Sequence, residues 1–134
     1  MPIISFLNKR SVLIICAMGH IICVASQKGG TGKTTTAVNL AASLALLEND
    51  TLLVDCDPLG NATTGVGVGK GRLAHDLFDA LTGVMSSRDI LVDSDLDRLQ
   101  VLPARVGLHR AEQVLAGNPR PDPVSYTHLR AHET

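Results

Sequence analysis

The residues best suited to chemistry lie in the segment QKGGTGKTT (27–35). Its glycines are Gly29, Gly30 and Gly32. They let the backbone turn several N–H groups toward one anion, and a helix beginning near Lys33 would add the positive end of its dipole. The Lys33 ammonium would reach the β- and γ-phosphates of a nucleotide, and the Thr34 hydroxyl would bind Mg²⁺. The segment is therefore predicted to bind phosphate rather than to form a purely structural turn.

The loop departs from the standard phosphate-loop pattern at its first position and carries a second lysine beside it. That pattern, G-x-x-x-x-G-K-[ST], requires a glycine where the chain has Gln27, and it does not require Lys28. Lys28 lies five residues before Lys33, at the mouth of the loop. Two cations this close repel each other unless an anion lies between them or one of them serves another site. Lys28 is therefore a candidate for a separate role, the alternative being a solvated lysine on a loop.

Two carboxylates follow the next apolar run, TLLVDCD (51–57). Asp55 and Asp57 stand at the carboxyl end of a predicted strand, which is where open α/β sheets bind their ligands. A solvated strand end is the alternative interpretation. The placement beside a phosphate loop favours a functional role for both side chains. Asn61 is expected to order the turn that follows.

The elements that position these residues form one predicted βαβ unit. The run HIICVAS (20–26) is short, apolar and β-rich, which is typical of a buried parallel strand. Residues 34–47 carry apolar side chains at helical spacing, and Asn49 can take the left-handed conformation that ends a helix. Residues 51–57 form the second strand. The crossover between the two strands is expected to be right-handed.

The rest of the chain adds shorter elements. Residues 58–72, PLGNATTGVGVGKGR, are too polar for a core and are predicted to be a functional loop. Leucines and a phenylalanine within 73–81 indicate a short amphipathic helix. A strand is expected at 99–104 and a final short helix at 108–115. No internal repeat and no second domain is apparent.

Composition limits the class of protein. The 134 residues are 45% hydrophobic and 19% charged, which suits one globular domain with a modest core. A net charge of −1 gives no whole-chain signature of a nucleic-acid binder. The three cysteines form no C-x-x-C pair and lie in or beside apolar runs, so reduced, buried thiols of a cytosolic protein are predicted rather than metal ligands.

Two stretches of the chain resemble a known family. They are KGGTGKTTTAVNLAASLA (28–45) and LLVDCDPLGNATTGVGV (52–68). Both resemble the ParA/Soj-type partition ATPases, which belong to the deviant Walker A class with a loop of the form K-G-G-x-x-K-[ST]. In that class Lys28 matches the signature lysine. The resemblance covers Met18 to about Gly117.

The resemblance implies a fold. It is the α/β fold of P-loop NTPases, with a mainly parallel sheet flanked by helices, and residues 18–123 would form the N-terminal part of one such domain. The chain would be truncated before the Walker B strand, which in this family lies beside the phosphate-loop strand. A gap in the sheet with unpaired strand edges is therefore expected.

The resemblance also implies a nucleotide site. Its residues would be Gly29, Gly30, Thr31, Gly32, Lys33, Thr34 and Thr35. Thr34 would bind Mg²⁺, with Asp55 supporting the metal indirectly, and Thr35 would contact the α-phosphate of ATP. Asp57 would sense the γ-phosphate and position the attacking water. Leu59 stands where the family usually has Gln, so a polar contact from the side chain at this position is not expected here.

Catalysis would involve Lys28, Lys33 and Asp57, with Lys28 reaching the partner's phosphates across an ATP-bound homodimer. This dimer would bind DNA nonspecifically through a missing C-terminal half, and a ParB-like protein would stimulate hydrolysis. The protein would be cytoplasmic and nucleoid-associated, with no membrane contact. A MinD-like, membrane-associated ATPase and a non-enzymatic gene remnant are the alternatives. The sequence DPLGNAT (57–63) favours the partition type for the parent, whereas the fragment itself is expected to be inactive.

Both ends are expected to lie outside the domain. Residues 1–17 imitate a secretory signal, but His20 interrupts the apolar run, and no stretch is long enough to span a membrane. Met18 offers an alternative start, which makes 1–17 an upstream extension. The tail VSYTHLRAHET (124–134) matches, in order, the translation of a transposon-end sequencing adaptor. It is therefore interpreted as a scar that is not native, the alternative being a natural disordered tail.

Overall fold

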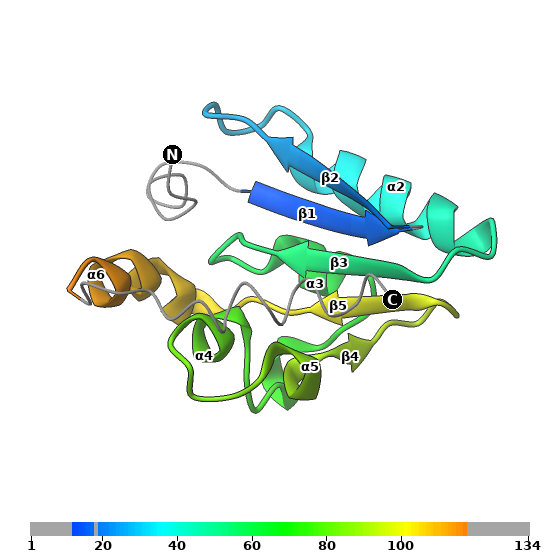
Figure 1. Cartoon of the computed structure of the whole chain (residues 1–134). Coiled ribbons are helices and arrows are strands. Elements are labelled where there is room, and N and C mark those ends of the chain that lie inside the picture. Colours follow the sequence, from blue (N-terminus) through cyan, green and yellow to red (C-terminus); the bar gives the residue numbers. More distant parts are fainter. Residues whose placement is uncertain (1–11, 18, 118–134) are drawn as a thin grey trace.

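Five strands form one mixed sheet in the part of the chain that the structure, a computed structural model, describes: residues 12–17 and 19–117. The strands are β1 (Val12–Ala17), β2 (His20–Ala25), β3 (Thr51–Asp55), β4 (Val92–Asp93) and β5 (Leu99–Leu102). Their order across the sheet is β2-β1-β3-β5-β4 (Figure 1). β2, β3 and β5 run in one direction, and β1 and β4 run against their neighbours. The adaptor-like tail, 124–134, lies outside the described residues.

β1 occupies the place where a gap was expected. It pairs antiparallel with β2 along one edge and antiparallel with β3 along the other. The expectation of unpaired edges beside β2 is therefore wrong on the side facing β3. The interpretation of 1–17 as an upstream extension stays a prediction, whereas residues 12–17 form a strand of the sheet. The reason is physical: an apolar strand joined to β2 by a tight turn at Gly19 (φ 71°) reaches the open edge with little loss of chain entropy. It also satisfies backbone groups that would otherwise be unpaired.

Helices cover both faces of the sheet, which confirms the expected α/β class. The sheet is not mainly parallel as expected, because among the described strands only the β3–β5 pair is parallel. The helices are α2 (Lys33–Leu46), α3 (Asn61–Gly65), α4 (Leu77–Leu81), α5 (Ser87–Ile90) and α6 (Ala111–Ala116), with 3₁₀ turns at Lys70–Arg72 and Val106–Arg110. α2 and α3 pack on one face, whereas α4, α5 and α6 pack on the other (Figure 1). Alternation along β3 divides the core accordingly. Leu53 points toward α2, and Val54 points toward α4 and α6.

α2 follows the predicted helix closely. It begins one residue earlier than expected and buries Ala37, Ala41 and Ala45 against the sheet at a spacing of four. Its end differs from the prediction, because Glu48 rather than Asn49 adopts the left-handed conformation (φ 65°). The Asn49 side chain instead donates hydrogen bonds to main-chain carbonyls in the last turn of the helix.

The shorter elements agree less well with the sequence pattern. The loop 58–72 contains α3, and the helix expected from residue 73 begins only at Leu77. Asp76 is the N-cap of this helix and forms a capping box with Asp79. Its carboxylate accepts the N–H of Asp79, and the Asp79 side chain accepts the N–H of Asp76. By contrast, the strand expected within 99–104 and ended by Pro103 runs from Leu99 to Leu102, in agreement with the prediction. Within the described residues, no helix is long and apolar enough to cross a membrane.

Candidate nucleotide site

The phosphate loop lies between the end of β2 and the start of α2. Gly30 and Gly32 have φ values of 72° and 80°, a backbone region that side-chain-bearing residues rarely adopt. Gly32 is the N-cap of α2, and its carbonyl accepts the N–H of Thr36 at 2.9 Å. The N–H groups at the helix start before Thr36 have no acceptor within the helix. They form a positively polarised end suited to a phosphate group.

Lys33 lies over this loop. Its ammonium donates to the carbonyl oxygen of Lys28 at 3.0 Å, and the Thr31 hydroxyl donates to the same oxygen at 3.3 Å. The N–H of Lys28 in turn donates to the Ser26 hydroxyl at 3.3 Å. These contacts hold the loop in a closed turn with the Lys33 charge on its inner side. Lys28 itself is exposed.

Asp55 is fully buried and hydrogen bonded through both oxygens. Oδ1 accepts the N–H of Asp57 at 3.0 Å, and Oδ2 accepts the N–H and hydroxyl of Thr63 at 2.8 and 2.7 Å. Burial raises the pKa of Asp55 above its ordinary value, and the hydrogen bonds from Thr63 and Asp57 partly oppose this rise. Asp55 thus acts on the chain around it, which fits an indirect role better than direct metal binding.

Asp57 begins a tight turn beside the end of β5. Its Oδ1 accepts the N–H of Leu59 at 3.0 Å, and its carbonyl accepts the N–H of Gly60 at 2.8 Å. Gly60 has φ 62°, and a Cβ there would lie 2.6 Å from the carbonyl oxygen of Ala104. Only glycine therefore fits this turn without displacing its neighbour. The Leu59 side chain is 62% exposed, so the family's usual Gln position faces solvent here.

Sequence reasoning missed Thr63, Ala104 and Lys70 at this edge. The Thr63 hydroxyl accepts the N–H of Ala104 at 3.2 Å, and the Lys70 ammonium donates to the carbonyl of Leu59. Thr63 lies in the segment DPLGNAT (57–63), but the sequence alone does not predict a role for its side chain. Asn61, expected to order the turn, is the first residue of α3.

The phosphate loop and the Asp57 turn lie at the same edge of the sheet, because β2 and β3 are parallel (Figure 1). They are not adjacent. β1 lies between their strands, with Leu13 opposite both Val24 and Asp55. Two strand spacings therefore separate the strands that carry the two halves of the site, about 10 Å in the plane of the sheet.

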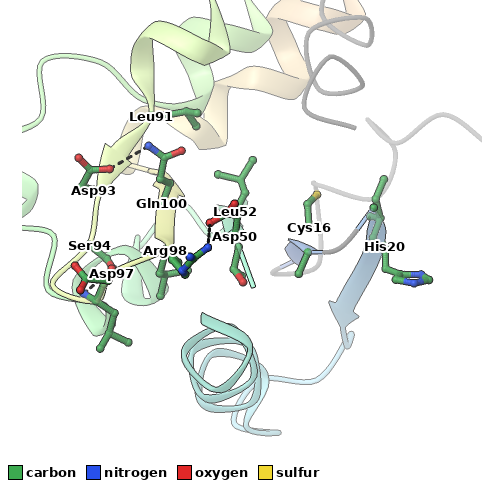
Figure 2. A pocket seen from close by; sticks show the side chains of 16 residues that line it. Cys16, His20, Asp50, Leu52, Leu91, Asp93, Ser94, Asp97, Arg98 and Gln100 are labelled. Atoms are coloured by element: carbon green, nitrogen blue, oxygen red, sulfur yellow. Dashed lines mark hydrogen bonds and ion pairs between the residues drawn. The ribbon is translucent and has the colours of Figure 1, made fainter. Parts of the chain in front are cut away.

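A cavity of about 540 Å³ lies at the opposite edge of the sheet, among residues at the starts of β2, β3 and β5 (Figure 2). Several of its polar groups pair with one another. Arg98 and Asp50 form an ion pair at 2.9 Å, and Gln100 donates to Asp93 at 3.0 Å. This cavity contains none of the predicted site residues.

Comparison with known proteins agrees with the geometry of the loop. The model of a protein family described as "AAA domain" matches residues 19–131. The chain belongs to this family. Its relatives include the chromosome partitioning protein ParA of Myxococcus xanthus, 48% identical over 95 residues, which are 71% of this chain and 34% of the relative. The sporulation initiation inhibitor protein Soj of Bacillus subtilis is 45% identical over 71% of this chain and 38% of its own length.

These relatives confirm the resemblance to ParA/Soj-type partition ATPases. The chain spans less than two fifths of the length of either relative. Among solved structures, cobyrinic acid a,c-diamide synthase from Mycobacterium smegmatis, with bound ADP and magnesium, superimposes with a TM-score of 0.72. The two sequences are 31% identical, and the superimposed region covers 80% of this chain and 43% of the synthase chain. The family's fold therefore extends to a protein that binds a nucleotide and Mg²⁺.

Proposed function

We propose that this chain is the ATP-binding part of a ParA/Soj-like ATPase that partitions chromosomes or plasmids. The observation that carries the proposal is the loop 26–32. Gly30 and Gly32 adopt the left-handed conformation there, α2 begins directly after the loop, and the Lys33 ammonium lies against the carbonyl of Lys28. That arrangement binds the phosphates of a nucleotide. The similarity to partition proteins supports the choice of process.

In this proposal the chain binds Mg²⁺·ATP. ATP would supply the phosphoryl group, and Mg²⁺ would supply positive charge that neutralises the phosphate oxygens. The Lys33 ammonium leaves the carbonyl of Lys28 for the β- and γ-phosphates, and the Thr34 hydroxyl binds Mg²⁺. Thr35, at the exposed helix start, contacts the α-phosphate. The Asp57 carboxylate orients the attacking water. Its place at the end of β3, at the same edge as the loop, supports this role.

Lys28 is proposed to act across a dimer. The residue is exposed at the mouth of the loop, and its carbonyl rather than its ammonium serves its own loop. The side chain is therefore available to a second subunit's phosphates, in the way an arginine finger stabilises charge on a transferred phosphoryl group. The DNA-bound state of the dimer, its ParB-like partner and its place on the nucleoid are proposed for the whole protein.

Nucleotide binding tests the proposal directly. The chain is titrated into a fluorescent ATP analogue with Mg²⁺, and Lys33→Ala is compared with Lys28→Ala. Both variants lose one positive charge from the same loop, so they form a matched pair. We expect Lys33→Ala to weaken binding at least about tenfold, because it removes a charged donor to the phosphates. Lys28→Ala should stay within about twofold of the unmodified chain. Equal losses in the two variants would contradict the assignment.

A further inference from the structure

Thr63 connects three segments that are distant in the sequence. It is fully buried, and its hydroxyl donates to Asp55 Oδ2 at 2.7 Å while accepting the N–H of Ala104 at 3.2 Å. Its own N–H donates to the same Asp55 oxygen at 2.8 Å. One side chain therefore joins the end of β3, the first turn of α3 and the residues just after β5. The hydroxyl uses both its donor and an acceptor site in doing so.

The turn that carries Asp57 is anchored to this network at both ends. Before the turn, Asp55 accepts the N–H of Asp57. After it, Gly60 packs so closely against the carbonyl of Ala104 that a Cβ would not fit. The position of Asp57 therefore depends on the spacing between the ends of β3 and β5, and Thr63 spans that spacing.

We infer that Thr63 is a positioning residue of the proposed ATPase site: through Asp55 and Ala104 it holds the Asp57 turn where a γ-phosphate is read. The inference rests on the proposed function. The phosphate loop makes no contact with this network through the hydrogen bonds of Lys33, Thr31 or Lys28, which remain within the loop itself. Loss of the Thr63 hydroxyl should therefore affect recognition of the γ-phosphate and leave recognition of the other phosphates unchanged.

Thr63→Val and Thr63→Ser separate the hydroxyl from the shape of the side chain. Valine fills the same space but leaves the Asp55 carboxylate and the Ala104 N–H with one partner fewer in a buried place. Serine keeps the hydroxyl. We expect Thr63→Val to lower the ratio of ATP to ADP affinity about fivefold or more, with ADP affinity changed less than about twofold. Thr63→Ser should restore the ratio to within about twofold of the original. If the valine variant does not fold, Thr63→Ala takes its place with the same expectation.

Amide hydrogen exchange supplies a readout that needs no nucleotide. In Thr63→Val the amides of Asp57 and Ala104 should exchange faster, whereas the amide of Thr36 in α2 should keep its rate. If Thr63→Val leaves the ratio of ATP to ADP affinity unchanged, for example because both nucleotides bind equally more weakly, the inference is overturned. Failure of Thr63→Ser to restore the ratio would also overturn it. A chain that binds no nucleotide but shows the local change in exchange would overturn the proposed function and, with it, the role in reading γ-phosphate.

Discussion

Substitution of Ile15 tests whether β1 is an integral strand of the sheet. Its side chain is 0% exposed and belongs to the core between the sheet and α2. Truncation to alanine removes buried methyl and methylene groups and leaves a cavity, which costs about 2–5 kcal/mol at such sites. Since domains of this size are stable by about 5–15 kcal/mol, Ile15→Ala should remove a large part of the free energy of unfolding.

Ile21→Ala is the matched control. Ile21 lies on β2 in the same hairpin, and its side chain is 63% exposed. The same chemical change should therefore cost no more than about 0.5 kcal/mol there. Urea unfolding followed by circular dichroism measures both, and with a slope of about 2 kcal/mol/M the Ile15 variant should lose roughly 1–2.5 M in midpoint. Midpoints that shift equally, or an Ile15 variant as stable as the original, would show that 12–17 do not lie in the sheet.

Two further predictions concern the Asp57 turn. Burial raises the pKa of Asp55 above 3.8, so the folded chain holds this proton more tightly than the unfolded chain does. The stability that Asp55 contributes is therefore fully present below pH 3.8 and is lost as the pH rises through the raised pKa of the folded chain. The unfolding free energy of the original chain minus that of Asp55→Asn should fall over this range, and a flat or rising difference would contradict the assignment. Gly60→Ala should cost about 1–3 kcal/mol because of its positive φ and the Ala104 carbonyl. At Gly69 an added Cβ would meet no atom within 4 Å beyond its chain neighbours, so Gly69→Ala should change stability by no more than about 1 kcal/mol, and equal thermal shifts in the two variants would refute the argument.

Local pattern was enough to predict the core of the site. The glycines, Lys33 and the helical spacing after them are contiguous, so the loop, α2 and the location of the adjoining strands could be predicted from short windows of sequence. The prediction that residues 20–26 form a buried parallel strand was wrong, because β2 is an edge strand with no buried residue and pairs antiparallel with β1. Asp57 was also placed at the correct end of β3. The predicted roles of all the site residues stay predictions, because they concern a nucleotide, a metal ion and a second subunit; these residues are Lys28, Gly29, Gly30, Thr31, Gly32, Lys33, Thr34, Thr35, Asp55 and Asp57.

Long-range pairing was not predictable in the same way. The pairing of 12–17 within the sheet was not predicted, because Met18 offers an alternative start, although two apolar runs around Met18 and Gly19 are also typical of a hairpin. Thr63 reads as a polar loop residue. Its burial depends on Ala104, 41 residues later, and no local periodicity reports a contact at that separation.

The position of β1 has a consequence for local unfolding. Among the described strands, β2 pairs only with β1, whereas α2, which follows the phosphate loop, packs directly on the sheet in the core that contains Leu53. Opening of the ladder between β1 and β3 would therefore release the β1–β2 hairpin, while α2 still held the C-terminal end of the loop and Asp55, Thr63 and Ala104 stayed bonded to one another. The strand before the loop and the Asp57 turn thus belong to different units of local stability. The free energy of that opening sets the fraction of molecules in which β2 keeps its place in the sheet.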